Sequence, residues 1–270
     1  MGGDPRNSAN RREGAAPRDS ADARKGAERL LAAIRDARRA VAFTGAGVST
    51  ISGIRDFRGP GGLYGEMDAE KIFGREQFDL DPSLFYKLAG PFVYSFGEKE
   101  PSVAHVALAE LEARGLLRAV ITQNIDMLHQ KAGSRNVIEL HGSPAMHHCL
   151  RCAGVRVGYE EAARVVRAGG MPLCPECGRA LKPAITFFGE RLPAGALREA
   201  TGESQEADLM LVLGTSLAVY PAASMPDHAL SRGGRVVIAN NMPTHLDSRA
   251  AMRFGELAPL FEALRDLLRG

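Results

Sequence analysis

The four cysteines of the chain have the residue types and the spacing of a metal site. They fall into two Cys-x-x-Cys pairs, Cys149 with Cys152 and Cys174 with Cys177, separated by residues 153–173. Each pair can form a knuckle that points two thiolates at one ion, and four thiolates complete a tetrahedral zinc site with no open position for water. Disulfides or a redox pair fit this spacing less well. We predict a structural zinc ribbon, with the two histidines directly before Cys149 exposed to solvent.

A glycine-rich turn follows the apolar run Ala40–Thr44 and could approach a phosphate. Gly45 and Gly47 let the backbone turn tightly after a strand, and a helix that starts there offers free N–H groups to a pyrophosphate. The pattern is half of a dinucleotide-binding fingerprint, because Thr50 stands at the third glycine position and no strand ending in Asp or Glu follows about 20 residues later to hold a ribose. On the glycines alone, an ordinary strand-to-helix turn is an equally good interpretation.

Polar residues close three further apolar runs. Asn124 and Asp126 lie in Thr-Gln-Asn-Ile-Asp, where amide and carboxylate groups could bind a ligand or simply cap a helix. His141 lies in Glu-Leu-His-Gly and is a candidate base, because an imidazole titrates near neutral pH. The Gly-Thr-Ser turn at 214–216 adds hydroxyl groups that can bond a ribose or a phosphate, although an ordinary loop would look much the same.

The elements that would position these residues alternate between strands and helices. Six apolar runs read as strands: Ala40–Thr44, Ala119–Thr122, Val137–Leu140, Ala184–Phe187, Leu209–Leu213 and Val236–Ala239. Five segments have helical periodicity: Ala27–Arg38, Val103–Arg114, Ala196–Gln205, Pro221–Ser231 and Glu256–Leu268. This alternation predicts an α/β fold with a doubly wound, parallel, Rossmann-like sheet. The ligand site is expected at the carboxyl ends of its strands.

Two segments interrupt the alternation and are predicted to be inserts. Residues 60–100 hold aromatic residues and helical pieces, and residues 146–182 hold the cysteines. We expect a cofactor-binding loop and helical insert in the first and a small zinc-binding domain, the zinc ribbon, in the second. The remaining parts are a disordered tail over 1–25 and a Rossmann-like domain assembled from 26–59, 101–145 and 183–270.

The composition argues against several classes of partner. Lys and Arg number 34 and Asp and Glu number 32, a net charge of +2 that is too balanced for a nucleic-acid or anionic-membrane surface. No stretch reaches the roughly 18 apolar residues of a membrane span, and the N-terminus lacks the apolar core of a secretory signal. We expect a cytoplasmic protein that binds neither membrane nor nucleic acid directly.

Taken in order along the chain, these motifs resemble those of the sirtuins, NAD-dependent protein-lysine deacylases, of the bacterial and archaeal type. The resemblance covers about residues 27–269. It rests on Gly-Ala-Gly-Val-Ser, Gly-Ile-Arg-Asp-Phe-Arg-Gly, Thr-Gln-Asn-Ile-Asp, Glu-Leu-His-Gly, the paired Cys-x-x-Cys, Phe-Phe-Gly-Glu and Gly-Thr-Ser, in the family's order. It implies that NAD is consumed to remove acetyl or other short neutral acyl groups from lysine side chains of proteins or peptides. The products would be nicotinamide, O-acetyl-ADP-ribose and deacetylated lysine.

The resemblance assigns most of the motif residues to NAD. Asp56 and Arg58 would order the cofactor-binding loop, and Asn124 and Asp126 would form the nicotinamide pocket. These two would share the catalytic work with His141, which would deprotonate a ribose hydroxyl. The implied cofactor-binding set is Gly45, Ala46, Gly47, Thr50, Asp56, Phe57, Arg58, Tyr64, Gln123, Asn124, Ile125, Asp126, His141, Gly214, Thr215, Ser216 and Asn240.

The resemblance also places an acyl-lysine substrate. Its side chain would pass through an apolar tunnel beside Phe188, while Gly189, Glu190 and Val219 would pair with the peptide backbone. Thr186 stands where many sirtuins have Val at the acyl-lysine pocket, a change that could alter acyl preference. The Tyr and Arg that bind succinyl groups in desuccinylating sirtuins are not matched here, which disfavours succinyl and malonyl groups.

Four other functions would use some or all of the same motifs. A protein mono-ADP-ribosyltransferase would share the NAD pocket, and a deacylase for longer acyl groups would share the whole site. A non-catalytic NAD-sensing or peptide-binding module is expected to have lost the Asn-Ile-Asp or His-Gly elements, and both are present. A Rossmann dehydrogenase would lack its ribose-binding acid and leave the zinc ribbon unexplained.

Overall fold

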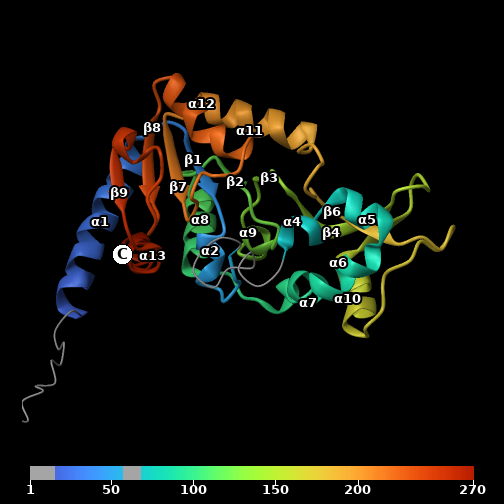
Figure 1. Cartoon of the computed structure of the whole chain (residues 1–270). Coiled ribbons are helices and arrows are strands. Elements are labelled where there is room, and N and C mark those ends of the chain that lie inside the picture. Colours follow the sequence, from blue (N-terminus) through green and yellow to red (C-terminus); the bar gives the residue numbers. More distant parts are fainter. Residues whose placement is uncertain (1–15, 57–67) are drawn as a thin grey trace, which may run out of the picture.

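A computed structural model describes residues 16–56 and 68–270 of the chain (Figure 1). Its main sheet has six parallel strands in the order β3-β2-β1-β7-β8-β9. These strands are β1 Ala40–Thr44, β2 Ala119–Thr122, β3 Val137–Glu139, β7 Leu209–Leu213, β8 Arg235–Ala239 and β9 Met252–Phe254. The chain runs outward in opposite directions from β1, so the predicted doubly wound parallel sheet is confirmed and its switch point lies between β1 and β7.

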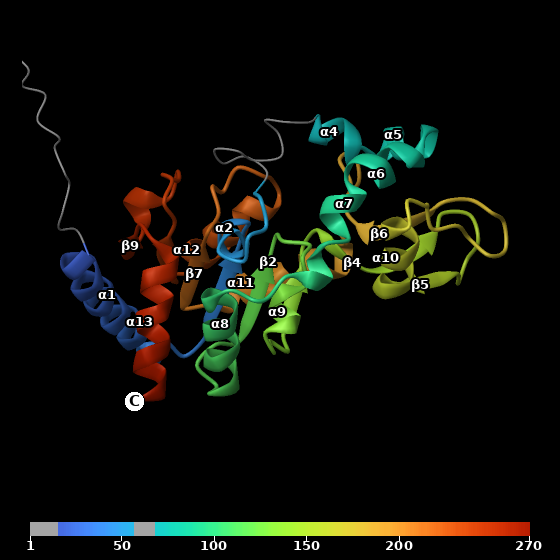
Figure 2. The ribbon, with the colours of Figure 1, turned by 90° about the horizontal axis from the view of Figure 1, so that it is seen from below.

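Helices cover both faces of this sheet because its central strands are apolar on both sides. Ala42 packs into one core and its neighbours Val41 and Phe43 into the other, and all three are fully buried. The first core is shared with α1 Ala16–Asp36, α8 Val103–Ala113 and α13 Leu257–Arg269, the second with α11 Ala194–Glu206 and α12 Met225–Ser231. Helices α1 and α13 lie side by side in both views (Figures 1 and 2).

A second unit lies at the opposite end of the molecule from α1 and α13 (Figures 1 and 2). Its small antiparallel sheet has the order β5-β4-β6, and α10 packs beside it. The elements are β4 Gly142–Cys149, β5 Arg156–Gly158, α10 Tyr159–Arg167 and β6 Leu181–Ile185. Five short helices before it form the helical insert: α4 Ala69–Ile72, α5 Arg75–Leu80, α6 Pro82–Leu88, α7 Gly90–Val93 and a 3₁₀ helix over Phe96–Glu98.

Short helices also follow several strands. They are α2 Gly47–Thr50, α9 Leu128–Lys131 and 3₁₀ helices over Ala222–Ser224 and Asp247–Arg249.

Aromatic side chains pack the helical insert against the small sheet, since Phe73, Phe78, Phe85, Tyr86 and Phe187 form a cluster of edge-to-face and tilted rings. In the parts of the chain that the structure describes, no helix combines the length and the apolar content needed to cross a bilayer.

Three expectations about the elements are wrong. The run Ala184–Phe187 is not a strand of the parallel sheet, because β6 ends at Ile185 and pairs antiparallel with β4. The sixth parallel strand is β9, three residues with an exposed Arg253 at their centre, which gave no apolar run to detect. The zinc-binding small domain predicted over 146–182 is also too short, because the strands of its sheet span 142–185.

The third wrong expectation concerns the N-terminal tail. Helix α1 starts at Ala16, so residues 16–25 are helical and not part of a disordered tail; residues 1–15 lie outside the described chain. The segment is rich in Ala, Arg and Lys, which favour helix, and Arg24 pairs with Glu28 one turn later at 3.3 Å. Helical propensity therefore carries the helix beyond the part that packs on the sheet.

The buried face of α13 predicts a large cost for truncation. Leu264 is fully buried between this helix and the sheet, so Leu264→Ala is expected to lower the free energy of unfolding by about 2–5 kcal/mol. The exposed Glu262 on the same helix is the matched control, and Glu262→Ala is expected to change it by less than about 0.5 kcal/mol. Urea unfolding measures both, and equal effects would contradict this packing.

Candidate active site and metal centre

A cavity of about 1010 Å³ opens at the carboxyl edge of the parallel sheet, where it meets the small sheet. The loops after β1, β2, β3, β7 and β8 and the segment after β6 all contribute to its wall. The predicted residues that line it are Gly45, Ala46, Gly47, Asp56, Gln123, Asn124, Ile125, His141, Phe188, Gly189, Glu190, Gly214, Thr215, Ser216, Val219 and Asn240. A cavity therefore lies at the edge of the sheet where a ligand site was expected.

Two further residues of the predicted NAD site, Asp126 and Thr50, do not line this cavity. Asp126 is buried behind the cavity wall, and the exposed Thr50 donates its hydroxyl to the carbonyl of Gly47 at 3.0 Å. Phe57, Arg58 and Tyr64 fall outside the described residues.

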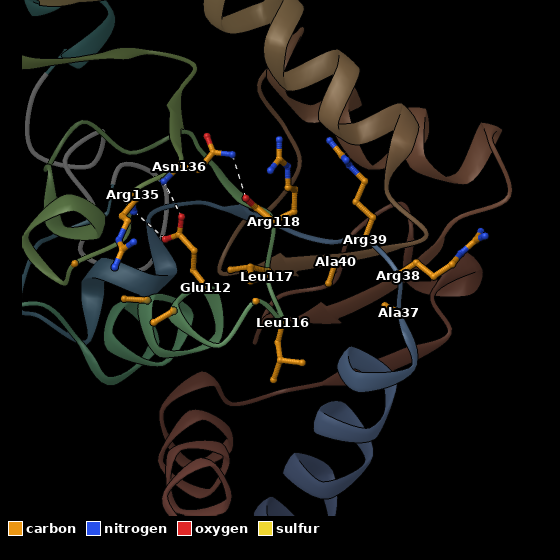
Figure 3. Close-up of a pocket in the computed structure, with 14 residues that line it drawn as sticks. Ala37, Arg38, Arg39, Ala40, Glu112, Leu116, Leu117, Arg118, Arg135 and Asn136 are labelled. Carbon is orange, nitrogen blue, oxygen red and sulfur yellow. Dashed lines mark hydrogen bonds between the residues drawn. The ribbon is translucent and has the colours of Figure 1, made fainter.

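A second cavity, of about 450 Å³, lies at the opposite edge, where β1, β2 and β3 begin (Figure 3). Four arginines line it, but acids pair with three of them. Arg39 and Arg118 pair with Glu203 at 2.8 and 3.5 Å, and Arg38 pairs with Asp208 at 3.4 Å. Glu112 lies in the wall and accepts two main-chain N–H groups at 2.8 Å. This edge offers an anionic ligand little net positive charge, so the larger cavity is the candidate site.

Two glycine turns interlock at the floor of the larger cavity. The N–H of Gly47 donates to the carbonyl of Gly214 at 2.8 Å, and a Cβ added to Gly47 would lie only 2.6 Å from the Cα of Gly214. Gly214 also adopts a positive φ of 60°, which favours glycine. The loops after β1 and β7 thus approach each other through bare backbone, and any side chain at either glycine would force them apart.

The hydroxyl of Ser49 organises the polar groups after β2. It donates to the Asp126 carboxylate at 2.6 Å and accepts from the Asn124 amide at 3.0 Å. Asn124 also donates to the carbonyl of Gly45 at 3.0 Å, so both amide hydrogens are in use and its Oδ1 is the atom left to accept from a ligand. Burial raises the pKa of Asp126, although the Ser49 hydroxyl and the Leu128 N–H act to lower it.

Two buried histidines lie beneath this network. The ring of His105 accepts the Ser102 N–H at its Nδ1, 3.1 Å away, so the ring hydrogen sits on Nε2 and faces the Ser49 hydroxyl at 3.5 Å. His129 lies edge-on to this ring, with centroids 4.5 Å apart. Burial lowers the pKa of His105 to about 4 and holds that of His129 well below its usual value, so both rings are neutral near pH 7.

The sequence reasoning did not identify Ser49, His105 or His129 as parts of the site. Ser49 lies inside the Gly-Ala-Gly-Val-Ser motif, and a histidine on the apolar face of the helix over Val103–Arg114 was the available signal for His105. Ser102 caps that helix with His105, and a capping pair gives a structural reason for both residues. Asp126 also accepts the N–H of Leu128, the first residue of α9, at 2.9 Å, although the N-cap residue of that helix is Met127.

His141 is held by a hydrogen bond from one of its ring nitrogens to the main chain. Its Nδ1 lies 2.7 Å from the Gln123 carbonyl, which can only accept, so Nδ1 carries the hydrogen and the neutral ring keeps its lone pair on Nε2. The carbonyl of His141 accepts from the N–H of Thr186 at 2.8 Å. This arrangement fixes the His141 ring at the junction of the two sheets, in the wall of the cavity.

The polar lining of the cavity fits a dinucleotide. Amide and hydroxyl groups of the kind that bond ribose, phosphate and carboxamide come from Gln123, Asn124, Thr215, Ser216 and Asn240. Gln123 donates to the Thr215 hydroxyl at 2.9 Å, which ties the loop after β2 to the loop after β7. Toward the small sheet the lining becomes apolar and aromatic, with the half-exposed Phe188 in it.

The four cysteines form one cluster that fits a zinc ion. Their sulfur atoms all lie within 4.8 Å of one another, and the Sγ atoms of Cys149 and Cys177 are 3.6 Å apart. Zinc–sulfur bonds in a tetrahedral site place sulfur atoms about 3.8 Å apart. The N–H groups of Arg151 and Cys152 point at the Cys149 sulfur, at 3.4 and 3.2 Å, and such donors stabilise a thiolate ligand.

The expected solvent exposure of the histidines before Cys149 is wrong for His147. This residue is fully buried, and its Nε2 lies 2.6 Å from the Tyr94 hydroxyl. The ring also stacks against that of Tyr94, so the residue joins β4 to the helical insert. Burial lowers the pKa of His147 to about 4, and the residue acts as a neutral part of the core.

The chain is similar to known proteins over most of its length. The model of the Sir2 family matches residues 45–221. An NAD-dependent protein deacetylase of Thermotoga maritima is 45% identical over 221 residues, which make up 82% of this chain and 89% of that protein. An NAD-dependent protein deacylase of Thermococcus kodakarensis is 47% identical over 207 residues, 76% of this chain and 80% of that protein.

Solved structures agree with this similarity. A Sir2 structure with a p53 peptide and NAD+ has a TM-score of 0.81 and 42% identity, and covers 90% of this chain and 98% of its own. A Sir2 structure with a propionylated peptide has a TM-score of 0.78 and 40% identity, with the same coverage of both chains.

The buried histidines predict a loss of stability in mild acid. The pKa of His105 is about 4 in the folded chain and about 6.5 in the unfolded chain, so between these values only the unfolded chain binds its proton. The stability present above pH 6.5 therefore falls as the pH drops, by about 1.4 kcal/mol per pH unit for each such histidine. In His105→Gln we expect a shallower fall between pH 6 and pH 5, measured by urea unfolding; parallel slopes would contradict this assignment.

The cysteine cluster predicts that zinc and the small sheet are lost together. Cys174→Ser removes one of four ligands, so we expect purified protein with far less than one zinc per chain and a stability lower by more than about 2 kcal/mol. The neighbouring Leu173 is exposed, and Leu173→Ser is the control that should keep its zinc. Elemental analysis measures the zinc content of both variants, and thermal unfolding measures their stability. Full zinc content in Cys174→Ser would contradict the assignment of the cysteines as zinc ligands.

Proposed function

The chain belongs to the Sir2 family, and from that premise we propose that it is an NAD-dependent protein-lysine deacetylase. It removes acetyl or other short neutral acyl groups from lysine side chains and yields nicotinamide, O-acetyl-ADP-ribose and free lysine. The observation that carries the proposal is the hydrogen bond from His141 Nδ1 to the Gln123 carbonyl, which leaves Nε2 as the basic nitrogen of a neutral ring that lines a cavity with polar and apolar halves.

We assign His141 as the general base of this reaction. Bound NAD supplies the bond to nicotinamide that breaks and the ribose hydroxyls that receive the acyl group. The Nε2 of His141 takes the proton from such a hydroxyl, and the hydrogen bond from Nδ1 to the Gln123 carbonyl stabilises the charged ring that results. Because the same bond fixes the ring orientation, little motion is needed before proton transfer.

We assign Asn124 and Asp126 to the nicotinamide pocket. The Ser49 hydroxyl bonds both side chains, which supports a fixed orientation of the Asn124 amide at the cavity wall. Asp126 lies behind this wall and is linked through the Ser49 hydroxyl to Asn124, which lines the cavity. The glycine turns and the hydroxyls at 215 and 216 are proposed to hold the phosphates and the adenosine.

We propose that the acyl-lysine side chain occupies the apolar half of the cavity. Phe73, Ile125, Phe187 and Phe188 line this part and exclude water from the acyl group. The segment 189–190 and Val219 lie in the same wall and would flank the peptide as backbone partners. The zinc cluster holds the small sheet whose strand β6 leads into this segment, so the metal is structural.

Mono-ADP-ribosyl transfer is the alternative within the same pocket. A base with a fixed lone pair is needed to activate the ribose hydroxyl in deacylation, and His141 offers it, which favours removal of the acyl group. Four cysteines that are used as zinc ligands and not as disulfides suit a reducing compartment, and we propose that the protein works in the cytoplasm, without direct contact with nucleic acid.

Incubation with an acetyl-lysine peptide, with and without NAD, tests this function. We expect the peptide to lose its acetyl group only when NAD is present, with release of an equal amount of nicotinamide. A heavier peptide with nicotinamide release would identify an ADP-ribosyltransferase. No consumption of NAD with any acyl peptide would indicate that the protein is a non-catalytic binding module.

The role of His141 predicts separate effects on binding and on turnover. His141→Ala is expected to lower kcat for deacetylation roughly 10²–10⁴-fold, the usual contribution of a general base. NAD affinity, measured by titration calorimetry, is expected to stay within about threefold, because the polar groups for the dinucleotide remain. His228→Ala in α12 is the control and should match the wild type. Near-normal turnover in His141→Ala would remove the residue from this role.

A further inference from the structure

The turn Phe187–Glu190, which follows β6, forms part of the cavity wall and is closed from two sides. Its backbone N–H at Glu190 donates to the carbonyl of Phe187 at 2.9 Å. In return, the N–H of Phe187 donates to the carboxylate of Glu190 at 2.8 Å. Gly189 between them has a φ of 88°. The shape of the turn thus depends on the Glu190 side chain as well as on its backbone.

A buried lysine holds this carboxylate from below. The ammonium of Lys182, on β6, lies 2.9 Å from Glu190 Oε2, and its side chain is only 3% exposed. It also donates to the carbonyl of Ile185 at 2.7 Å and lies 4.0 Å from the ring centroid of Phe187. A buried ammonium is costly without a partner, so Lys182 and Glu190 depend on each other.

An arginine holds the same carboxylate from the helical insert. Arg75, at the start of α5, donates to Glu190 Oε1 at 2.8 Å. Its main-chain N–H donates to the carbonyl of Phe188 at 2.9 Å, and the N–H of Phe188 donates to the carbonyl of Phe73 at 2.8 Å. One carboxylate therefore ties together the turn, β6 of the small sheet and the helical insert.

The side chain of Glu190 points into the protein, where its carboxylate is fully engaged. Burial acts to raise the pKa of Glu190, but the Phe187 N–H, Arg75 and Lys182 outweigh it and lower the pKa. The carboxylate is thus an anion near pH 7, engaged by two cations and one N–H of its own protein. It is not available to recognise a charge on a peptide, while the rim of the turn, with Phe188, remains exposed.

We propose that the Glu190 carboxylate, clamped by Lys182 and Arg75, is the positioning group that holds the turn Phe187–Glu190 in the shape that receives the substrate peptide. This proposal rests on the proposed function, because the turn is a docking segment only if the chain binds an acyl-lysine peptide. The ion cluster acts through the turn and touches neither NAD nor the acyl group.

Glu190→Gln tests this role because it keeps the shape of the side chain and removes its charge. We expect KM for the acetyl peptide to rise roughly tenfold, as for loss of one hydrogen bond to a charged group, with KM for NAD and kcat within about twofold. Asp79→Asn is the matched control: it removes the other acid that pairs with Arg75, at 2.9 Å, without touching the turn. It should leave peptide KM unchanged.

A double variant separates positioning from stability. Lys182→Met with Glu190→Leu removes both buried charges, so thermal stability is expected to exceed that of Lys182→Met alone. Peptide KM should remain raised, because no carboxylate holds the Phe187 N–H. Recovery of wild-type peptide KM in the double variant, or no change in Glu190→Gln, would overturn the proposal while leaving the deacetylase function in place. A wild-type protein that deacetylates no peptide would overturn both.

Discussion

The backbone contact between the loops after β1 and β7 is the constraint on which the site depends. Gly47 and Gly214 approach so closely that neither can carry a side chain, and the hydrogen bond between them fixes the spacing of the two loops. The contact lies at the switch point of the sheet, where helices leave on opposite faces and a crevice opens. The positions of the polar side chains that line the cavity depend on this backbone contact.

A layer of buried polar groups carries that order to the loop after β2. The chain of bonds runs from His105 through Ser49 to Asn124 and Asp126, and a parallel chain runs from His129 through Thr44 to the N–H of Asn124 by way of Thr122. Because these groups are buried, each needs its partner, and the orientation of the amide at the cavity wall is set from behind. Because His105 and His129 must stay neutral in this layer, its hydrogen bonds are stable only above the pH at which the two rings bind a proton.

The small sheet and the helical insert supply the other half of the cavity. The zinc cluster fixes one end of β4, and His141, at the other end of the strand, bonds both the loop after β2 and the segment after β6. Movement of the small unit would therefore alter the positions of the His141 ring and of the turn Phe187–Glu190 together. The aromatic cluster around Phe187 gives that unit a core of its own.

Much of this arrangement follows from the sequence. The apolar runs at β1, β2, β7 and β8 were predicted to within a residue, because buried parallel strands are short and uninterrupted, and the cysteine spacing predicted the cluster. An apolar run does not reveal which sheet it joins, so Ala184–Phe187 was assigned to the wrong one. Helical periodicity marked α8 but could not show that His105 on its apolar face lies beneath the Ser49 hydroxyl and the side chains of Asn124 and Asp126. Such contacts depend on the packing of segments far apart in the chain.

The most direct test of the account follows the acetyl group itself. A peptide carrying acetyl-lysine labelled with carbon-13 in the acetyl group is incubated with the protein and NAD, and the labelled products are separated and weighed by mass spectrometry. Transfer through the proposed site predicts label in O-acetyl-ADP-ribose in an amount equal to the nicotinamide released. Label recovered as free acetate without consumption of NAD would contradict the account.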